Sequence, residues 1–191
     1  MDFATLKSFI RSDLYRYVGQ SGWKTGIQVF FSNPGFKYSA MMRLCLFFKT
    51  HSFSRYTVFF PSAWLFHRYS VKYGICIPFT TKIGSGFYIG HYGGIVVSKE
   101  TSIGKNCNIS HGVTIGQANR GIRKGQPAIG DNVYIGPGAK IFGSIKIGNG
   151  CAIGANSVVN KDVPDNSVVV GVPGVIISSN GSQGYINRTD Y

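Results

Sequence analysis

Aliphatic residues recur at every sixth position over the second half of the chain. The positions are Ile83, Ile89, Ile95, Ile103, Ile109, Ile115, Ile129, Ile135, Ile141, Ile147, Ile153 and Val159. Eleven of these twelve residues are isoleucine, and eight are followed directly by glycine. An α-helix would repeat at about 3.6 residues and a simple strand at every second residue, so neither fits. A six-residue repeat is typical of a parallel β-helix, in which each hexad supplies one short strand and one corner.

Three hexads make one triangular coil, with the isoleucines stacked inside it as a ladder. The fifth position of the hexad is also predicted to be small and to point inward, as at Cys107, Ala139, Cys151 and Ser157. The register breaks twice, by two residues between Ile95 and Ile103 and by eight between Ile115 and Ile129. The second insertion, within "QANRGIRKGQPA", is polar and basic, so we expect a loop that leaves the coil. Loops on rigid scaffolds commonly carry function.

Two of the four histidines occupy the same place in this repeat. His91 and His111 are each the third residue of a hexad, and the twenty residues between them amount to one full coil. They are therefore predicted to lie on one corner of neighbouring coils, about 4.8 Å apart, in a column that continues through Pro137 and Ala155. Two stacked imidazoles near a basic loop indicate a site. The alternative for His111 is a polar corner residue exposed to water.

Residues 1–74 have a different, helical pattern. Helices are predicted in "FATLKSFIRSDLYRYVG", which ends at Gly19, in "NPGFKYSAMMRLCLFFKTH", and in "FPSAWLFHRYSVKYG", which has Pro61 near its start and Gly74 at its end. This section caps the open end of the β-helix, lays a basic, aromatic face on an anionic membrane, or does both. The predicted organisation is a helical section over 1–74, a β-helix over 75–177, and a polar, disordered tail over 178–191.

The net charge of +13 favours anionic partners. No nucleic-acid recognition motif supports nucleic acid as the partner. Apolar runs fall short of the about 20 residues that a membrane span needs, and the start of the chain has no secretion signal. We therefore expect a cytoplasmic protein, with the inner face of the membrane as a further location. Four cysteines without a CxxC pair argue against a structural zinc site and against a disulfide scaffold.

Residues 76–177 resemble the hexapeptide-repeat acyltransferases, within them the serine acetyltransferase-like branch, and most of all its polysaccharide and capsule O-acetyltransferases. The resemblance rests on "IGHYGGIVVSKETSIG", "HGVTIG", the looped insertion, "IGPGAKIFGSIKIGNGCAIGANSVVNKDVP" and "GVPG". It implies a mainly β protein, a left-handed parallel β-helix with an α-helical N-terminal section. It also implies a homotrimer with acetyl-CoA in the groove between neighbouring β-helices, and no metal.

The resemblance also assigns roles. His91 heads the pattern H-x-x-G-I-V-V, where the family has its catalytic base, a task that imidazole performs well near neutral pH. Glu100 matches another family position and is the second catalytic candidate. The candidate positions for binding acetyl-CoA are Gly116, Ala139, Ala155 and Lys161.

Three departures from the family concern the acceptor. Gly90 and Cys76 stand where serine acetyltransferases have aspartates, and Gln126 replaces a histidine; with His111 these are the candidate substrate-binding positions. A free amino acid carries an ammonium group that carboxylates would recognise. The sequence therefore predicts acetyl transfer to a sugar hydroxyl in capsule, O-antigen or exopolysaccharide synthesis. The alternative is the serine O-acetyltransferase of cysteine synthesis.

Two other classes compete with these enzymes. A zinc enzyme of the γ-carbonic anhydrase kind needs three histidines from two subunits, and this chain offers two on one corner without an obvious third. A β-helix that kept its fold and lost its chemistry would serve as a binding scaffold. These alternatives remain open at the level of sequence.

Overall fold

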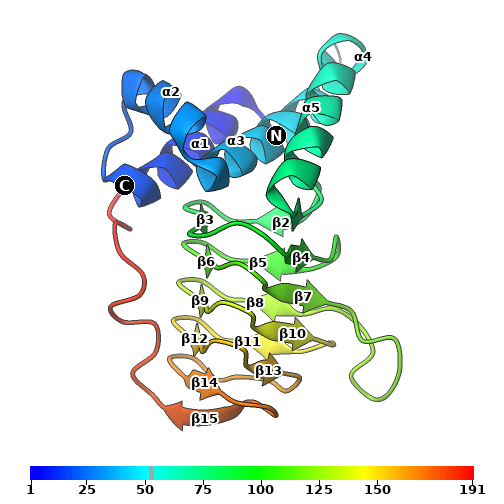
Figure 1. Cartoon of the computed structure of the whole chain (residues 1–191), viewed down its shortest axis with the longest axis vertical. Helices are drawn as coiled ribbons and strands as arrows, with labels where there is room; N and C mark the ends of the chain where they lie inside the picture. The colour runs from blue at the N-terminus through cyan, green and yellow to red at the C-terminus, as the bar shows by residue number, and fades with distance from the viewer. Residues whose placement is uncertain (52–53) are drawn as a thin grey trace.

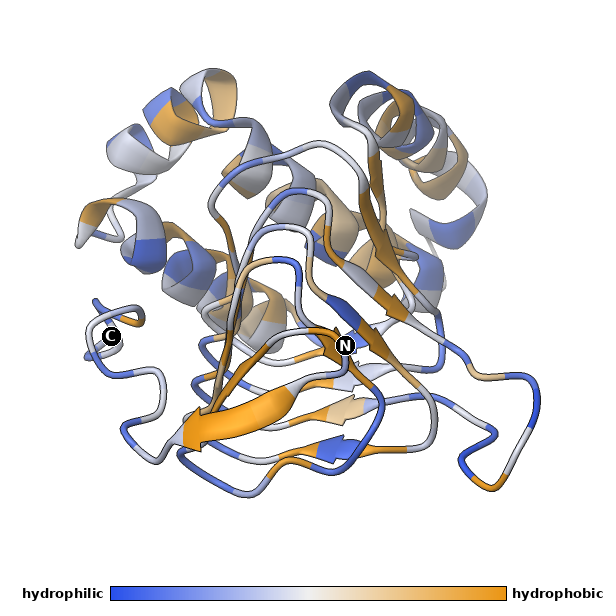
Figure 2. Ribbon diagram, turned by 60° about the horizontal axis from the view of Figure 1, so that its bottom comes forward, coloured by the Kyte–Doolittle hydropathy of each residue, from blue (hydrophilic) through white to orange (hydrophobic). Residues whose placement is uncertain are grey.

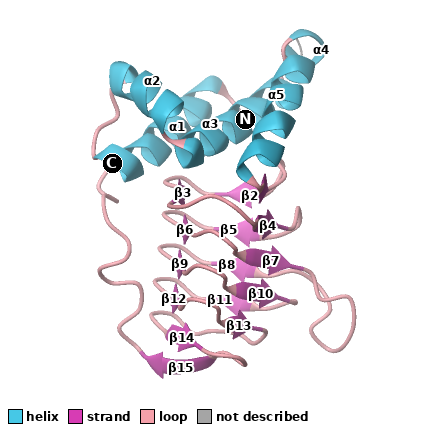
Figure 3. Cartoon of the chain, viewed as in Figure 1, coloured by secondary structure: helices cyan, strands magenta, loops and turns pink. Residues whose placement is uncertain are grey.

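A layer of helices sits on one end of a coil of short strands (Figures 1 and 3). The computed structural model describes residues 1–51 and 54–191. The helices are α1 (Phe3–Val18), α2 (Trp23–Ser32), α3 (Pro34–Thr50), α4 (Ser54–Thr57) and α5 (Phe59–Tyr73). All three helices expected from the sequence are present.

The strands form three sheets, one for each side of the coil. Sheet A has the order β1 (Ile75–Cys76), β4 (Ile95–Val97), β7 (Thr114–Gly116), β10 (Lys140–Phe142) and β13 (Val158–Val159). Sheet B has the order β2 (Lys82–Ile83), β5 (Ser102–Ile103), β8 (Ala128–Ile129) and β11 (Lys146–Ile147). Sheet C has β3 (Tyr88–Ile89), β6 (Asn108–Ile109), β9 (Tyr134–Ile135), β12 (Ala152–Ile153), β14 (Val168–Val170) and β15 (Val175–Ser178).

All strand pairs are parallel except that between β14 and β15, which closes the far end of the coil. The strands carry both hydrophilic and hydrophobic residues in the view of Figure 2, and their isoleucines fill the interior. The fifth-position residues Cys107, Ala139, Cys151 and Ser157 are fully buried, as predicted. The period of six therefore produces the predicted parallel coil of three-sided turns.

The expected register was wrong in one place. Val97, and not Ile95, pairs with Ile115, whereas Ile95 pairs with Ile75. The two inserted residues therefore lie in the corner between β3 and β4, which carries His91, and not after Ile95. Both Ile95 and Val97 are buried, because the inward positions of this three-residue strand alternate. Apolar character alone could not distinguish them.

The ends of the helices follow local signals. Gly19 and Gly74 end α1 and α5 in the left-handed conformation, with φ of 68° and 61°, which glycine adopts without steric cost. The side chain of Asn33 accepts the Phe36 N–H at the start of α3, and Pro34 follows it. Helix α2 was not expected, because it starts after Gly22 without a side-chain cap and only Val29 is buried.

The helices cap the coil, as one of the two alternatives predicted. The first turn of the coil has no turn above it, so its backbone groups need other partners. The Tyr38 hydroxyl accepts from the Ile77 N–H at 3.1 Å and donates to the Ile77 carbonyl at 2.9 Å. Tyr17 does the same for Ile89, at 2.9 and 3.3 Å. Each tyrosine thus replaces the hydrogen bonds of a missing strand.

A buried ion pair completes this layer. Arg43 and Asp13 are 3% and 0% exposed, with 3.2 Å between Nε and Oδ2. Arg43 also donates to the carbonyls of Ile83 and Gly84, at 2.6 and 2.5 Å, and Asp13 accepts the Phe87 N–H at 2.8 Å. Burial raises the pKa of Asp13, and the charge of Arg43 opposes that rise. A buried pair survives desolvation when its remaining hydrogen bonds are made, and here the coil makes them.

The polar tail is not disordered, contrary to expectation. It runs from β15 back along the outside of the coil to the helices (Figure 1). The Tyr185 ring stacks on Tyr134 with centroids 4.4 Å apart, and Asn108 donates to the Tyr185 carbonyl at 3.0 Å. Arg188 donates to the Tyr17 carbonyl of α1. A composition typical of disorder is overridden here by aromatic stacking and by backbone partners on the coil.

No helix within residues 1–51 and 54–191 is both long and apolar enough to cross a membrane.

Removing the Tyr38 hydroxyl should destabilise the whole chain. Tyr38→Phe leaves the buried N–H and carbonyl of Ile77 without partners, so we expect a loss of about 2–4 kcal/mol in unfolding free energy. Urea denaturation followed by circular dichroism measures this loss. Tyr56→Phe is the matched control, because Tyr56 is 76% exposed and its change should cost less than about 0.5 kcal/mol. Equal stability of the two variants would contradict the capping role.

Candidate active site

The two histidines lie together at the corner between sheets C and A. Their rings meet edge to face, with centroids 6.0 Å apart and planes at 77°. The pairing of Ile89 with Ile109 sets their positions, since each histidine follows its isoleucine by two residues. Both side chains are exposed. The sequence thus predicted their juxtaposition correctly.

Glycines shape this corner. Gly94, Gly112 and Gly138 stack in successive turns with φ of 65°, 70° and 74°. A side chain on any of them would be strained in this left-handed conformation. The Gly112 N–H donates to the Gly93 carbonyl at 2.8 Å, so the enlarged His91 corner is tied to the His111 corner below it.

Lys140 supports the same corner and was not singled out from the sequence. Its ammonium group donates to the Gly112 carbonyl at 2.5 Å and to the Thr114 hydroxyl at 3.2 Å. Lys140 is the first residue of β10, and the register of sheet A aligns it with Thr114. A signal was present, because the hexad repeat that pairs Ile141 with Ile115 also places Lys140 beside Thr114.

The corner has no carboxylate. The residues that surround the histidines in the described turns, 88–94, 108–114, 134–140 and 152–158, include no aspartate or glutamate. The ring of His111 is the contact that the structure provides for the ring of His91. Gly90 itself leaves little room for an aspartate, because an added Cβ would lie 3.2 Å from the Tyr88 ring.

The other sequence-predicted residues do not gather in one place. Cys76 is exposed on β1 of sheet A, where it pairs with Val96. Glu100 is not brought to His91: the two residues lie beyond opposite ends of β4, and the Glu100 carboxylate is 3.8 Å from Lys99. Ala139 points into the core and is fully buried, so its side chain cannot touch a ligand. Its backbone carbonyl accepts the Thr114 N–H at 2.9 Å.

Three of the remaining candidates, Gly116, Gln126 and Lys161, lie at the corner between sheets A and B. Gly116 ends β7, and the predicted loop follows it and projects from the coil (Figure 1). Gln126 lies at the base of this loop and donates to Gln117 at 3.0 Å. Lys161 is exposed just after β13. Ala155, by contrast, is exposed in the histidine column, as the sequence predicted.

One ion pair ties the loop to the coil. Arg123 donates to Asp162 Oδ2 at 3.0 Å, and Asp162 Oδ1 accepts the Lys146 N–H at 2.8 Å. The Lys146 N–H and the Arg123 side chain lower the pKa of Asp162. The ion pair therefore stabilises the folded chain fully at pH values above the ordinary carboxylate pKa of about 3.8. This stabilisation is lost as the pH falls through the lowered pKa of Asp162. Lys161, which precedes Asp162 in the chain, is exposed.

No metal centre is evident in the described residues. Across positions 1–51 and 54–191, the structure contains no group of three or more histidine, cysteine, aspartate or glutamate side chains that could hold an ion.

Comparison with known proteins agrees with this architecture. Residues 127–161 match the family model of the bacterial transferase hexapeptide (six repeats). The serine acetyltransferase of Neisseria gonorrhoeae is 30% identical, with a TM-score of 0.74 over 93% of this chain and 68% of that one. The chain belongs to the hexapeptide-repeat transferase family.

Two further relatives bear on the site. A serine acetyltransferase of Bacillus pumilus is 44% identical over 115 residues, which cover 60% of this chain and 52% of that protein. The chain therefore spans about half the length of that curated relative. The Brucella abortus serine acetyltransferase in complex with coenzyme A is 30% identical, with a TM-score of 0.72 over 93% of this chain and 68% of that one. These names favour serine acetyltransferase over polysaccharide O-acetyltransferase, the opposite of our main expectation.

The ion pair between Arg123 and Asp162 should protect the transferase's loop from proteolysis. Asp162→Asn keeps an acceptor for Lys146 but loses the charge, so we expect trypsin to cut after Arg120 and Lys124 about two- to fivefold faster. Mass spectrometry of the fragments over time measures this rate.

Asp165→Asn is the matched control for the loop. Asp165 also accepts a backbone N–H of the coil, that of Asn149 at 2.8 Å, but its contacts in the described structure do not include the loop. If both variants were cut at the same rate, the ion pair would have no role in holding the loop.

Proposed function

We propose that this chain is an acetyl-CoA-dependent O-acetyltransferase of the serine acetyltransferase type, built on a left-handed coil, with His91 as its general base. The observation that carries the proposal is the exposed, edge-to-face pair of His91 and His111 on one corner of the coil. An exposed imidazole at a rigid, glycine-lined corner is accessible to a hydroxyl group and held in place for proton transfer.

Acetyl-CoA supplies the activated acetyl group as a thioester. His91 takes the proton from the acceptor hydroxyl as that oxygen bonds to the acetyl carbon, and it returns the proton to the sulfur when the carbon–sulfur bond breaks. The proton and the electron pairs therefore balance without a metal. His111 holds the His91 ring from the side, and the ammonium group of Lys140 fixes the backbone between His111 and Thr114.

Of the four positions predicted to bind acetyl-CoA, Lys161, Gly116 and Ala155 suit a phosphate-bearing ligand, and the buried Ala139 does not. Lys161 and the loop residues Arg120 and Lys124 are exposed cations near the end of sheet A, which suits the phosphates of coenzyme A. Ala155 and Gly116 leave space because they are small. Ala139 contributes only by filling the core of the coil.

The separation of these groups supports a homotrimer. His91, His111 and Ala155 precede strands of sheet A, whereas Gly116 ends β7 and the loop and Lys161 come after strands of that sheet. One chain therefore holds the base and the cations at opposite ends of the same sheet. A complete site requires one copy to place its histidine corner against the loop corner of the next, as in a threefold ring.

Serine is the acceptor that the relatives favour, since their names are serine acetyltransferase. In this proposal the amino acid lies against His91 and His111, with Gln126 of a neighbouring copy at the position where a family histidine stands. Gly90 and Cys76 border the same space.

A sugar hydroxyl is the second candidate, because one observation favours it. The histidine corner offers no carboxylate within the described turns, and Glu100 lies beside Lys99 at the far end of β4. A neutral sugar needs no partner for an ammonium group, whereas serine does.

Replacing the base should abolish turnover without unfolding the protein. We expect His91→Ala to lower the rate of coenzyme A release by at least about 100-fold, measured with a thiol reagent and a saturating acceptor. His67→Ala is the matched control, since His67 is exposed on α5, and it should change the rate by less than about twofold. An unchanged rate in His91→Ala, with the fold intact, would leave a scaffold without chemistry as the better explanation.

An acceptor panel separates the two candidates. Free serine, nucleotide sugars and oligosaccharide repeat units are incubated with acetyl-CoA, and mass spectrometry detects the acetylated product. We expect serine to be acetylated with a kcat/KM at least about tenfold above any sugar. The reverse order would replace serine by a sugar and would agree with the absence of a carboxylate at the corner.

A further inference from the structure

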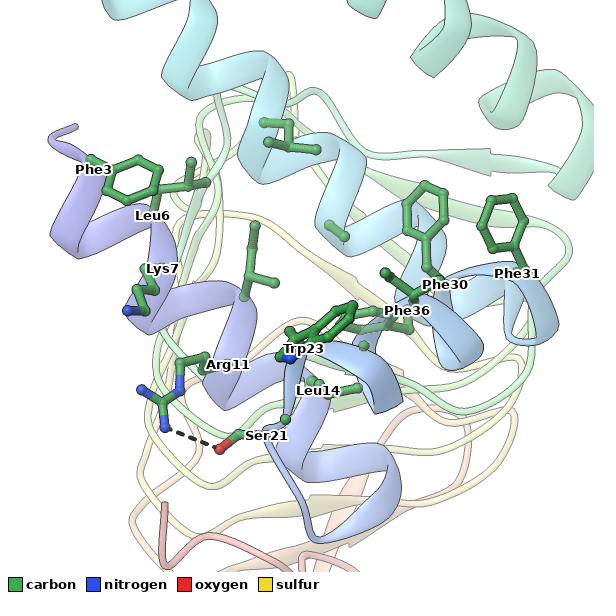
Figure 4. A pocket seen from close by; sticks show the side chains of 16 residues that line it. Phe3, Leu6, Lys7, Arg11, Leu14, Ser21, Trp23, Phe30, Phe31 and Phe36 are labelled. Atoms are coloured by element: carbon green, nitrogen blue, oxygen red, sulfur yellow. Dashed lines mark hydrogen bonds between the residues drawn. The ribbon is translucent and has the colours of Figure 1, made fainter.

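The side of the helical cap away from the coil contains an apolar groove that the proposed reaction does not use. It lies between α1, α2 and α3 and has a volume of about 650 Å³ (Figure 4). Leu14, Phe36 and Ala40 line it and belong to a small buried hydrophobic cluster that also contains Val29. The residues that line it all belong to the helices and their connections, so the groove is separate from the histidine corner.

Large apolar side chains are exposed around this groove. Trp23, Phe31 and Phe3 are 73%, 74% and 67% exposed. Keeping such rings in water forgoes about 25 cal/mol for each Å² of apolar area that could be buried. A cluster of exposed aromatic side chains around a groove commonly marks an interaction site.

Cations lie along the same rim. Lys7 and Arg11 stand one turn apart on α1, on the side of the groove opposite Phe30 and Phe31 (Figure 4). Arg11 donates to the Ser21 hydroxyl at 3.3 Å, which holds the guanidinium group at the rim. The ammonium group of Lys24 lies 5.6 Å from the centre of the Trp23 ring.

Little negative charge balances these cations. Residues 1–75 contain ten lysines and arginines but only two acidic residues, Asp2 and Asp13. Asp13 is buried against Arg43, and Asp2 caps the start of α1 by accepting the Thr5 N–H at 2.7 Å. The outer surface of the cap therefore combines an apolar groove with uncompensated positive charge.

We propose that this groove binds an anionic phospholipid of a bilayer surface, with acyl chain against Trp23 and Phe36 and phosphate against Lys7 and Arg11. The two occupants to compare are a second copy of this chain and an anionic bilayer, and charge distinguishes them. A second copy of the chain would bring two strongly cationic surfaces together, whereas an anionic bilayer attracts them. Exposed aromatic and basic residues on helices too short or too polar to span are typical of attachment at the membrane interface.

Vesicle sedimentation with the full chain tests this proposal. We expect binding to vesicles that contain phosphatidylglycerol, little binding to phosphatidylcholine alone, and weakening by added salt. The double variant Lys7→Gln/Arg11→Gln should bind at least about tenfold more weakly. Lys105→Gln/Lys146→Gln removes the same charge from the coil and should change binding by less than about threefold. Equal binding to both kinds of vesicle, or equal loss in both variants, would overturn the proposal.

Tryptophan fluorescence locates the contact. The chain has two tryptophans, so Trp64→Phe leaves Trp23 as the only reporter. We expect phosphatidylglycerol vesicles to shift its emission to the blue, and lipids brominated on the acyl chain to quench it. Absence of quenching would overturn the proposal.

Sedimentation velocity without lipid tests the competing occupant. The assembly should be the same size in the wild type and in Trp23→Ala. A smaller assembly in Trp23→Ala would show that the groove is an interface between copies, and would also overturn the proposal. All three measurements are independent of acetyl transfer, so their failure would leave the proposed reaction unaffected.

Discussion

The first turn of the coil depends on hydrogen bonds that no strand can supply. A parallel coil satisfies its backbone by stacking one turn on the next, so its first turn presents N–H and carbonyl groups at the core. Tyr17, Tyr38 and the pair of Arg43 and Asp13 satisfy these groups from the helices. The helical section is therefore a structural part of the β-helix. Its inner face is polar at a few defined points and apolar between them.

The same stacking fixes the candidate site. Because each residue lies above its counterpart one turn later, the pairing of Ile89 with Ile109 is sufficient to bring His91 and His111 together. It also keeps the loop and Lys161 at the other end of sheet A. The two corners lie at opposite ends of the sheet A strands within one chain. In the proposed homotrimer, a neighbouring copy supplies the second corner.

The two faces of the helical cap meet different requirements. The face toward the coil donates and accepts hydrogen bonds at the first turn and adds side chains such as Tyr38 and Met42 to the main core. The opposite side carries exposed aromatic rings and cations that fold stability does not need. Residues that expose apolar area at no structural benefit are free to serve recognition. An enzyme that acts near a membrane would gain from this division, because surface attachment leaves the corner between sheets C and A unobstructed.

The amino-acid pattern is sufficient to predict the six-residue repeat, and with it the three-sided parallel coil, the buried small residues, the projecting loop and the meeting of His91 with His111. These follow from strict periodicity, which local residues express directly. Three features appear only in the folded structure. Val97 rather than Ile95 pairs with Ile115 in the ladder, Lys140 donates to the Gly112 carbonyl at the histidine corner, and Tyr185 of the tail stacks on Tyr134. The tertiary structure also decided that Tyr17 and Arg43 bond to the coil. Such contacts join residues far apart in the chain, and their side chains have no local pattern that reveals the partner.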